Sequence, residues 1–187
     1  MAPKQRGRDR GGTSRVRGGG SSVKQCEAQV AEAASNGRVR VTGPNRQLPE
    51  KTITIKWEPG MPKVEFRRKA EALKRLGEEG KLYKATNPVA RDRKVTKSYR
   101  QHIIDRIWEL YHERNPEFAN KLIKRVTEKM DPDHVWELQL GGPDNWDNLR
   151  FLDRKTNQTI GKYQIWPQIR NLPDGTPIRI EVIGPPD

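Results

Sequence analysis

The sequence predicts an α+β fold, and three observations support that prediction. Apolar residues recur at helical spacing through the middle of the chain, between residues 65 and 130. After residue 130, a short segment has the composition of two strands joined by a Gly-Gly turn, and a helical segment follows it. The first 24 residues are rich in glycine, arginine and serine and carry too few apolar side chains to offset the entropy of ordering. We therefore expect a hairpin-helix core, backed by an α-helical segment and preceded by a disordered basic tail.

The composition sets limits on the size of the core and on the partner. The chain has 187 residues, of which 32% are hydrophobic and 33% are charged, so one compact domain with a tail is expected. Its net charge of +13 indicates an anionic partner. Nucleic acid fits best, because neutralising phosphates releases counterions and gives affinity without sequence preference. A membrane surface is the weaker alternative, because the sequence has no apolar run of spanning length and no long basic amphipathic helix.

We divide the chain into three regions. Residues 1–24 form the expected tail, which suits either a basic arm on nucleic acid or a solubilising extension. Residues 25–62 form an accessory or linker region, in which residues 38–41 and 52–57 alternate polar with apolar side chains and predict a small hairpin. Residues 63–187 form the main domain.

Two amphipathic helices are expected at the start of the main domain. The first runs from Glu65 to Glu79, where apolar residues recur at helical spacing and basic residues fill the outer face. The second runs from Thr96, as the N-cap, to about Arg114. We expect Trp108 of the second helix to pack in the core.

A third helix follows the second after a very short link. It starts at Pro116, because proline is favoured at the first helical position. It stops near Met130, because Pro132 disfavours helical geometry at the residue before it. Such a short link predicts that the second and third helices form an antiparallel pair or a corner that backs the hairpin.

The hairpin-helix core occupies about residues 131–166. Its expected parts are a strand at residues 133–138, a loop at residues 141–147 and a strand at residues 148–152. The helix begins at Asp153 or Thr156, with Asp153 suited to the N-cap, and presents Asn157 in its first turns. A closing strand is expected at residues 177–182.

The residues at the start of this core suit hydrolytic chemistry. A neutral imidazole is the side chain best able to take a proton from water at neutral pH, which makes His134 the candidate base. Asp133 precedes it, so on a regular strand the two side chains point to opposite faces, and we expect a turn that aims both into one site. The oxygens of Asp133 and Asn157 suit Mg²⁺, which takes few protein ligands beside water and substrate phosphate.

These residues resemble the HNH family of nucleases, whose shared unit is a β-hairpin followed by a helix around one metal ion, the ββα-metal fold. The family pattern has Asp-His, a loop that often ends in Gly-Gly, Asn-Leu on the second strand, and Asn or His on the helix. The matching positions here form an HNN variant: Asp133-His134, Gly141-Gly142, Asn148-Leu149 and Asn157. The separations of 14 residues from His134 to Asn148 and 9 residues from Asn148 to Asn157 are similar to those of the family.

The resemblance implies a metal-dependent endonuclease that hydrolyses phosphodiester bonds, with DNA as the expected substrate. It implies that His134 activates water, that Asn148 pins the loop and keeps His134 oriented, and that Asp133 and Asn157 hold a divalent ion. We expect Mg²⁺, with Mn²⁺ or Ni²⁺ as alternatives. Many members also carry paired CxxC zinc motifs, which this chain cannot form because Cys26 is its single cysteine. For the same reason we expect no disulfide-linked partner.

Basic residues around the core are candidates for contact with nucleic acid. Arg150 lies on the second expected strand, and Lys155, Lys162 and Arg170 follow it on the expected helical segment. The alternative is that these side chains are merely solvated, which is the usual state of a basic helix face.

A second resemblance concerns biology. The segment from about residue 64 to the end resembles the HNH toxin modules at the C-termini of bacterial polymorphic toxins, through residues 87–90, 115–118 and 165–176. It implies an antibacterial toxin effector, similar in action to a bacteriocin, with an acidic immunity protein as partner in the producing cell. The basic N-terminus has no apolar signal segment. We therefore expect synthesis in the bacterial cytoplasm without a signal peptide, and export by a specialised secretion system.

Two other interpretations stay open. The chain fits a phage or mobile-element HNH endonuclease, which would nick specific sites rather than degrade DNA generally. It also fits a basic nucleic-acid-binding protein without catalysis, which would shift DNA in a gel and never cut it.

Overall fold

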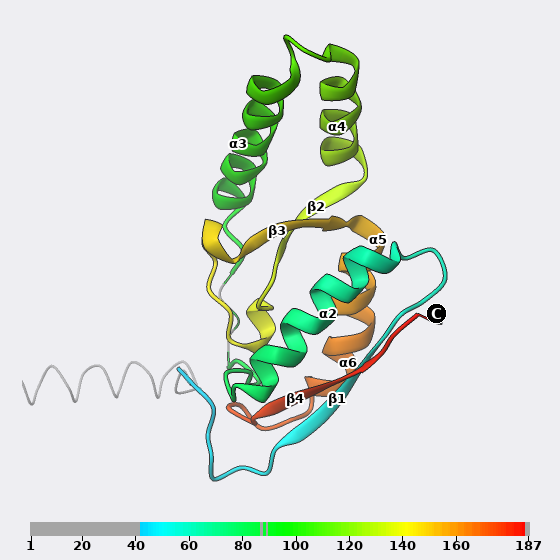
Figure 1. The fold of residues 1–187 in the computed structure, drawn as a ribbon. Helices are drawn as coiled ribbons and strands as arrows, with labels where there is room; N and C mark the ends of the chain where they lie inside the picture. Colours follow the sequence, from blue (N-terminus) through cyan, green and yellow to red (C-terminus); the bar gives the residue numbers. More distant parts are fainter. Residues whose placement is uncertain (1–41, 87, 89, 186–187) are drawn as a thin grey trace, which may run out of the picture. The chain divides into compact units, whose positions relative to one another are not determined.

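The computed structural model describes residues 42–86, 88 and 90–185, and it has the expected α+β character (Figure 1). Its strands are β1 (Lys51–Lys56), β2 (Met130–His134), β3 (Leu149–Asp153) and β4 (Ile178–Ile183). Its helices are α2 (Lys63–Glu78), α3 (Arg93–Tyr111), α4 (Pro116–Glu128), α5 (Arg154–Gln158) and α6 (Trp166–Ile169). Two short 3-10 helices, η1 (Leu138–Leu140) and η2 (Trp146–Asn148), and a π-helix, η3 (Thr159–Ile165), complete it. The expected tail at residues 1–24 lies outside the described residues.

Strand β1 pairs with the C-terminal strand β4. The two run parallel, with Lys51 opposite Ile178 and Lys56 opposite Ile183. The strand itself was expected, but its partner was not, because we had placed residues 52–57 in a hairpin with residues 38–41. Residues 38–41 lie outside the described residues. The β1–β4 pair therefore joins the region before residue 62 to the end of the chain.

Two glutamine side chains cover the other edge of β1. The amide of Gln168 accepts from the Thr54 N–H at 3.0 Å and donates to the Thr54 carbonyl at 2.8 Å. Gln164, four residues earlier, makes the same pair of hydrogen bonds with Lys56, at 3.0 and 2.8 Å. These carboxamides make the hydrogen bonds that a neighbouring strand would make. They therefore protect an edge that, if unpaired, would promote association with other chains. They also fix η3 and α6 beside β1.

The main hydrophobic core lies between α2, the β1–β4 pair and η3. Its central members are fully or almost fully buried: Ile53, Ile55, Phe66, Ala70, Leu73, Ile160, Ile165, Ile169, Ile178 and Ile180. Phe66, Ala70 and Leu73 supply it because they share one stripe of α2, as their helical spacing predicted. A Cβ on Gly77 would lie 3.3 Å from the Ile180 amide nitrogen, so glycine allows α2 to approach β4 closely.

Strands β2 and β3 form an antiparallel hairpin that leads directly into α5. Met130 lies opposite Asp153, and His134 lies opposite Leu149. Asp153 is the predicted N-cap of α5, and its carboxylate accepts from the Thr156 N–H at 3.0 Å. The first strand begins and ends earlier than the expected residues 133–138, because residues 138–140 turn into η1 instead of continuing the strand.

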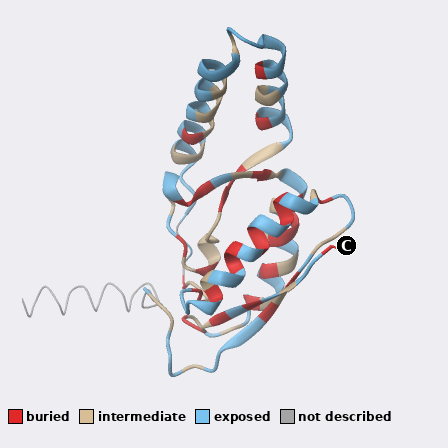
Figure 2. Cartoon of the chain, viewed as in Figure 1, coloured by how far each residue is buried: buried red, intermediate tan, exposed pale blue. Residues whose placement is uncertain are grey.

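Helices α3 and α4 pack against each other and leave much of their surface exposed (Figure 2). Tyr99 of α3 and Val126 of α4 are buried, whereas the side chain of Leu110 on α3 is exposed. The prediction that Trp108 lies in the core is wrong, because this residue is 45% exposed. The N-cap of α3 is Asp92 rather than Thr96. No helix within residues 42–86, 88 and 90–185 combines the length and apolar character needed to span a bilayer.

Candidate functional site

Asn148 holds the loop between β2 and β3 in place. Its Oδ1 accepts from the Trp136 N–H at 2.8 Å, and its Nδ2 donates to the Trp136 carbonyl at 2.9 Å and to the Pro143 carbonyl at 2.7 Å. The Val135 N–H donates to the Asn148 carbonyl at 2.8 Å. One buried carboxamide thus satisfies backbone groups on both sides of the loop. These are the contacts of a loop anchor, and they lie directly after His134.

The Gly-Gly pair is required by close approaches within the same loop. Gly141 has a φ of +89°, in the left-handed region that favours glycine, and a Cβ there would lie 2.3 Å from the Tyr83 ring. A Cβ on Gly142 would lie 2.0 Å from the Trp136 carbonyl oxygen. No side chain fits at either position without movement of its neighbours. The two glycines therefore allow the loop to pack closely enough for its backbone to reach the Asn148 side chain.

Asp133 is part of a buried charged cluster with Lys69 of α2 and Glu137. The Lys69 Nζ lies 2.9 Å from Asp133 Oδ2, 2.7 Å from Glu137 Oε1 and 2.5 Å from the His134 carbonyl oxygen, to which it donates. Burial raises the pKa of Asp133, and the Lys69 ammonium limits that rise. Burial alone would lower the pKa of Lys69, but the two carboxylates raise it above its ordinary value. Lys69 therefore stays charged and ties α2 to the end of β2.

His134 has a different partner, Asp144 of the loop. Its Nε2 lies 2.7 Å from Asp144 Oδ1, and both side chains are buried. Because an ionised carboxylate only accepts hydrogen bonds, this contact places the ring proton on Nε2 and leaves the lone pair on Nδ1. The Asp92 N–H donates to Asp144 Oδ2 at 2.6 Å, so the start of α3 fixes the carboxylate in turn.

The protonation states follow from these contacts. Burial lowers the pKa of His134, and the neighbouring Asp144 opposes this effect without overcoming it. Burial disfavours ionisation of Asp144, but the Asp92 amide and the His134 ring hold the pKa of its carboxyl below the ordinary value. At neutral pH the pair is a neutral imidazole held by an ionised carboxylate.

The structure does not aim Asp133 and His134 into one site. We expected a turn at this point, but β2 continues through His134, so successive side chains lie on opposite faces of the strand. Asp133 meets Lys69, and His134 meets Asp144. His134 is also only 1% exposed, which leaves little of its ring open to water in this conformation.

Asn157 lies on α5, half-buried, and its side chain makes no hydrogen bond to another described residue. A Cβ on Gly161, one turn later, would lie 3.7 Å from Glu137 Oε2, so this end of the helical segment lies beside the charged cluster. Asn157 therefore lies on the helix that could supply a second ligand to an ion beside Asp133. In this structure its side chain does not meet Asp133.

Of the four basic residues predicted to contact nucleic acid, one lies near Asp133 and Asn148. Arg150 lines a hollow together with Asp133 and Asn148. Lys155 instead donates to the Pro59 carbonyl at 3.0 Å, and the Lys162 Nζ lies 5.3 Å from the centre of the Tyr163 ring. Arg170 is exposed near the end of α6.

The donors around Asp133 have the chemistry of a site for a hard divalent cation. Two buried carboxylates share one ammonium, and Lys69 is the one cation within ion-pair distance of Glu137 Oε1 among the described residues. A divalent ion would neutralise this excess of negative charge. Within the part of the chain that the structure describes, His, Cys, Asp and Glu form no group of three that could hold a metal. A Mg²⁺ site needs no such group of three. One carboxylate and one carboxamide can be enough when water and phosphate oxygens supply the other ligands.

Sequence reasoning missed three residues of this region: Lys69, Glu137 and Asp144. A signal for Lys69 was present, because it lies three residues after Phe66 and four before Leu73, on the buried stripe of α2. A buried lysine needs a carboxylate partner. For Asp144 and Glu137 the sequence offers only their place in the loop, and the partners depend on how that loop folds.

No protein-family model, curated protein or solved structure matches the chain.

Proposed function

We propose that the protein is a metal-dependent HNH endonuclease, with a ββα-metal core formed by β2, β3 and α5, that hydrolyses the phosphodiester bonds of DNA. The observation that carries this proposal is the His134–Asp144 pair: a neutral imidazole held at 2.7 Å by a buried carboxylate, at the end of a hairpin strand. An imidazole fixed in one tautomer by a carboxylate is the arrangement of a general base. The net charge of +13 supports a polyanionic substrate.

In this proposal, His134 takes the proton from the attacking water through Nδ1. Asp144 keeps the ring in the required tautomer and stabilises the imidazolium that forms. Lys69, through the His134 carbonyl, and Asn148, through the loop, hold the backbone on either side of the ring. His134 is buried in this conformation, so substrate binding must expose its ring to the attacking water. Catalytic contacts often reach their final geometry only in the substrate complex.

Asp133 and Asn157 are the residues that would hold the ion, with the Glu137 carboxylate beside them. A divalent ion bound there, Mg²⁺ or alternatively Mn²⁺ or Ni²⁺, would neutralise charge on the phosphate and the leaving oxygen. Until an ion binds, Lys69 pairs with Asp133 and limits the rise in its pKa that burial causes, which favours the ionised form needed for the role.

The test is incubation of the purified chain with supercoiled plasmid, single-stranded DNA and RNA, each with Mg²⁺, Mn²⁺, Ni²⁺ or EDTA. We expect nicking and linearisation of the plasmid with at least one ion and none with EDTA. Intact plasmid under every condition, with DNA bound, would reject the proposal. Cleavage at one site only would favour the alternative of a phage or mobile-element nicking enzyme.

We propose further that the enzyme acts as an antibacterial toxin effector, exported by a specialised secretion system and neutralised in the producer by an acidic immunity protein. The support is its sequence resemblance to toxin modules and its basic surface, which suits an acidic inhibitor. Cytoplasmic expression in bacteria without an immunity gene should stop growth and degrade chromosomal DNA. Normal growth with intact protein present would count against this role.

A second candidate function is nucleic-acid binding without cleavage. The observation that favours it is that His134 is buried and Asp133 is engaged by Lys69, so neither group is free in this conformation. The plasmid experiment separates the two functions, because the second predicts a shift in gel mobility and no cut with any ion.

A further inference from the structure

Two adjoining hollows lie along the exposed side of α2. One has a volume of about 510 Å³, and its lining includes Arg68, Arg75, Arg150, Asp133 and Asn148. The other has a volume of about 590 Å³ and is lined by residues of α2: Val64, Arg67, Arg68, Glu71, Ala72 and Arg75. Both hollows share Arg68, Ala72 and Arg75. We call this continuous depression the α2 groove.

The spacing of residues on α2 creates the groove. Arg68, Ala72 and Arg75 are separated by four and three positions, so they lie on one face of the helix. Ala72 is short and leaves room between the two long arginines. Arg150, on β3, supplies a third guanidinium from the hairpin side. The groove therefore combines one helix face with the edge of the predicted catalytic hairpin.

The arginines of the groove outnumber its acidic residues and form no ion pair with them. Glu71 and Asp147 also line the two hollows, and Arg75 acts electrostatically on Glu79, but none of these carboxylates is within ion-pair distance of a groove arginine. Arg67 and Arg75 form no hydrogen bond or ion pair through their side chains with another described residue. Arg68 donates to the Phe151 carbonyl and Arg150 to the Leu149 carbonyl, which leaves both exposed guanidinium groups with their charge unpaired. The carboxylate of Asp133, which also lines the groove, pairs with Lys69 rather than with an arginine. An exposed guanidinium fork that is not engaged in an ion pair is well suited to bidentate contact with phosphate.

We propose that the α2 groove binds the phosphodiester backbone of the nucleic acid, with Arg68 and Arg75 as its principal contacts and Arg150 on the opposite wall. This inference rests on the proposed function and deepens it, because Asp133 and Asn148 in the groove would lie beneath the bound backbone. Contacts to phosphate position the strand without reading its sequence. The groove thus assigns a substrate-binding role to residues outside the hairpin-helix core.

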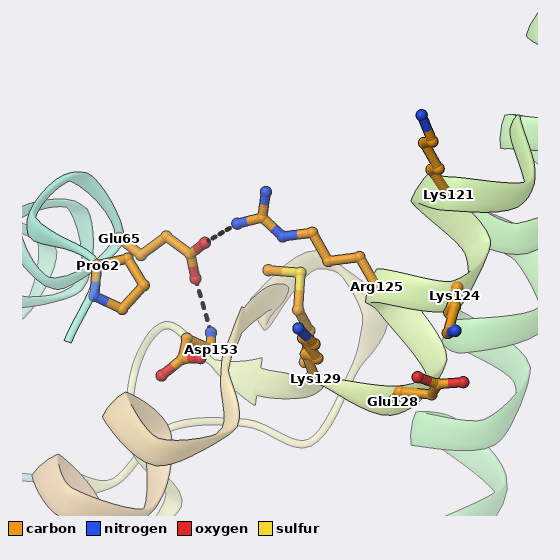
Figure 3. Close-up of a pocket in the computed structure, with 9 residues that line it drawn as sticks. Pro62, Glu65, Lys121, Lys124, Arg125, Glu128, Lys129 and Asp153 are labelled. Carbon is orange, nitrogen blue, oxygen red and sulfur yellow. Dashed lines mark hydrogen bonds and ion pairs between the residues drawn. The ribbon is translucent and has the colours of Figure 1, made fainter. Parts of the chain in front are cut away.

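A second basic hollow, beside α4, provides the comparison (Figure 3). It has a volume of about 490 Å³ and contains Lys121, Lys124 and Lys129. Its arginine, Arg125, is neutralised by Glu65 at 2.6 Å, and the other Glu65 oxygen accepts from the Asp153 N–H at 2.7 Å (Figure 3). Glu128 and Asp153 add further negative charge to its lining. Glu65 joins α2, α4 and β3 here, which is a structural role.

The experiment measures binding of the full chain carrying His134→Ala, so that cleavage does not interfere, to a fluorescent DNA duplex over a series of salt concentrations. The test variant adds Arg68→Gln and Arg75→Gln. The matched control adds Lys121→Gln and Lys124→Gln, which removes the same charge from the hollow beside α4. We expect the arginine pair to weaken binding about tenfold and to lower the salt slope by about one for each arginine, and the lysine pair to change affinity less than about twofold.

An unchanged affinity in the arginine variant, or an equal or larger loss in the lysine variant, would overturn the assignment. Arg75→Gln alone guards against misfolding, because Arg75 makes no side-chain hydrogen bond or ion pair with the described residues, and its Tm should equal that of the parent. Arg68→Lys with Arg75→Lys should restore part of the affinity.

If the wild-type chain binds through the groove but never cuts, the proposed function fails and the groove stands. If it cuts while the arginine variant binds normally, the groove fails and the function stands.

Discussion

The two sides of the last residues of β2 differ in how they bury charge. On one side, Asp133 meets Lys69 and Glu137 in a buried ion-pair cluster that includes a residue of α2. On the other side, His134 is neutral and shares one hydrogen bond with Asp144, whose position depends on the loop and on the start of α3. Adjacent residues of one strand thus belong to a charged cluster and to a neutral imidazole–carboxylate pair.

Under the proposed mechanism, the Asp133 side serves stability and the His134 side serves the chemistry. Removing one member of a buried ion cluster leaves another charge without a partner, which destabilises the fold. Removing the neutral ring leaves a cavity and takes one hydrogen bond from Asp144, which keeps the Asp92 N–H as a donor. We therefore expect substitutions around Asp133 to act mainly on stability and substitutions around His134 to act mainly on rate.

Lys69→Met should give the largest change in stability. It leaves Asp133 and Glu137 buried without their ammonium, which should lower the free energy of unfolding by about 3–5 kcal/mol. The control is Lys74→Met, on the same helix, whose ion pair with Glu78 at 4.0 Å is solvent-exposed and should contribute about 0–1 kcal/mol. Urea unfolding of both variants measures the difference. Equal losses would show that the cluster does not stabilise the hairpin.

Gly142→Ala should have the next largest effect, because it acts on the loop that joins the two sides. The new Cβ would lie 2.0 Å from the Trp136 carbonyl oxygen, a backbone atom that cannot move alone. We expect a loss of at least about 1–3 kcal/mol in the free energy of unfolding. Gly43→Ala, where a Cβ meets nothing within 4 Å, should change stability by less than about 0.5 kcal/mol. A Tm for Gly142→Ala that matched the Gly43→Ala value would contradict the close packing of this loop.

Asp144→Asn should lower the cleavage rate with little loss of stability. A carboxamide can donate to Nε2 as well as accept from it, so the ring is no longer held in the tautomer with its lone pair on Nδ1. We expect a fall of at least about tenfold in the single-turnover rate. Asp147→Asn removes an exposed carboxylate from the same loop and should not slow cleavage. A full rate for Asp144→Asn would mean that Asp144 does not position the base.

Asp144→Asn should also shift the pH dependence of cleavage, which is a smaller effect than the loss of rate. His134 is active when neutral, and burial lowers its pKa, so the acidic limb of the rate profile should lie below the ordinary pH range of histidine titration. Asp144 raises that pKa, and its removal should therefore shift the limb to still lower pH. Rates of plasmid cleavage at a series of pH values measure the shift. An unchanged limb would assign it to another group, such as Asp133, whose pKa burial raises.

The elements that the sequence predicted correctly are those set by local signals. Helical periodicity located α2 and α3, Asn115-Pro116 located the start of α4, and Asp153 was recognised as a cap. The partner of β1 was missed because it lies near the other end of the chain, and nothing in residues 51–56 distinguishes a parallel partner from a hairpin partner. Trp108 was misplaced because an apolar stripe predicts a buried face only where another element covers it.

The candidate site divides in the same way. Asp133, His134, Asn148 and the Gly-Gly pair follow an order and spacing that the sequence displays, and the contacts of Asn148 suit the loop-anchoring role expected of it. The partners that decide protonation and charge, Lys69 and Asp144, come from a distant helix and from an irregular loop. Sequence spacing carries no information about which of several nearby carboxylates will face an imidazole, because tertiary packing decides that.

The most direct test of the account compares cleavage of supercoiled plasmid by the wild-type chain and by His134→Ala, in the presence of the ion that supports the highest wild-type rate. General-base catalysis contributes about 10²–10⁴ to the rate, so the variant should lose activity by that factor while it remains folded at the assay temperature and its affinity for DNA stays close to the wild-type value. A variant that cuts plasmid at the wild-type rate would remove His134 from the chemistry and with it the hydrolytic role of the hairpin.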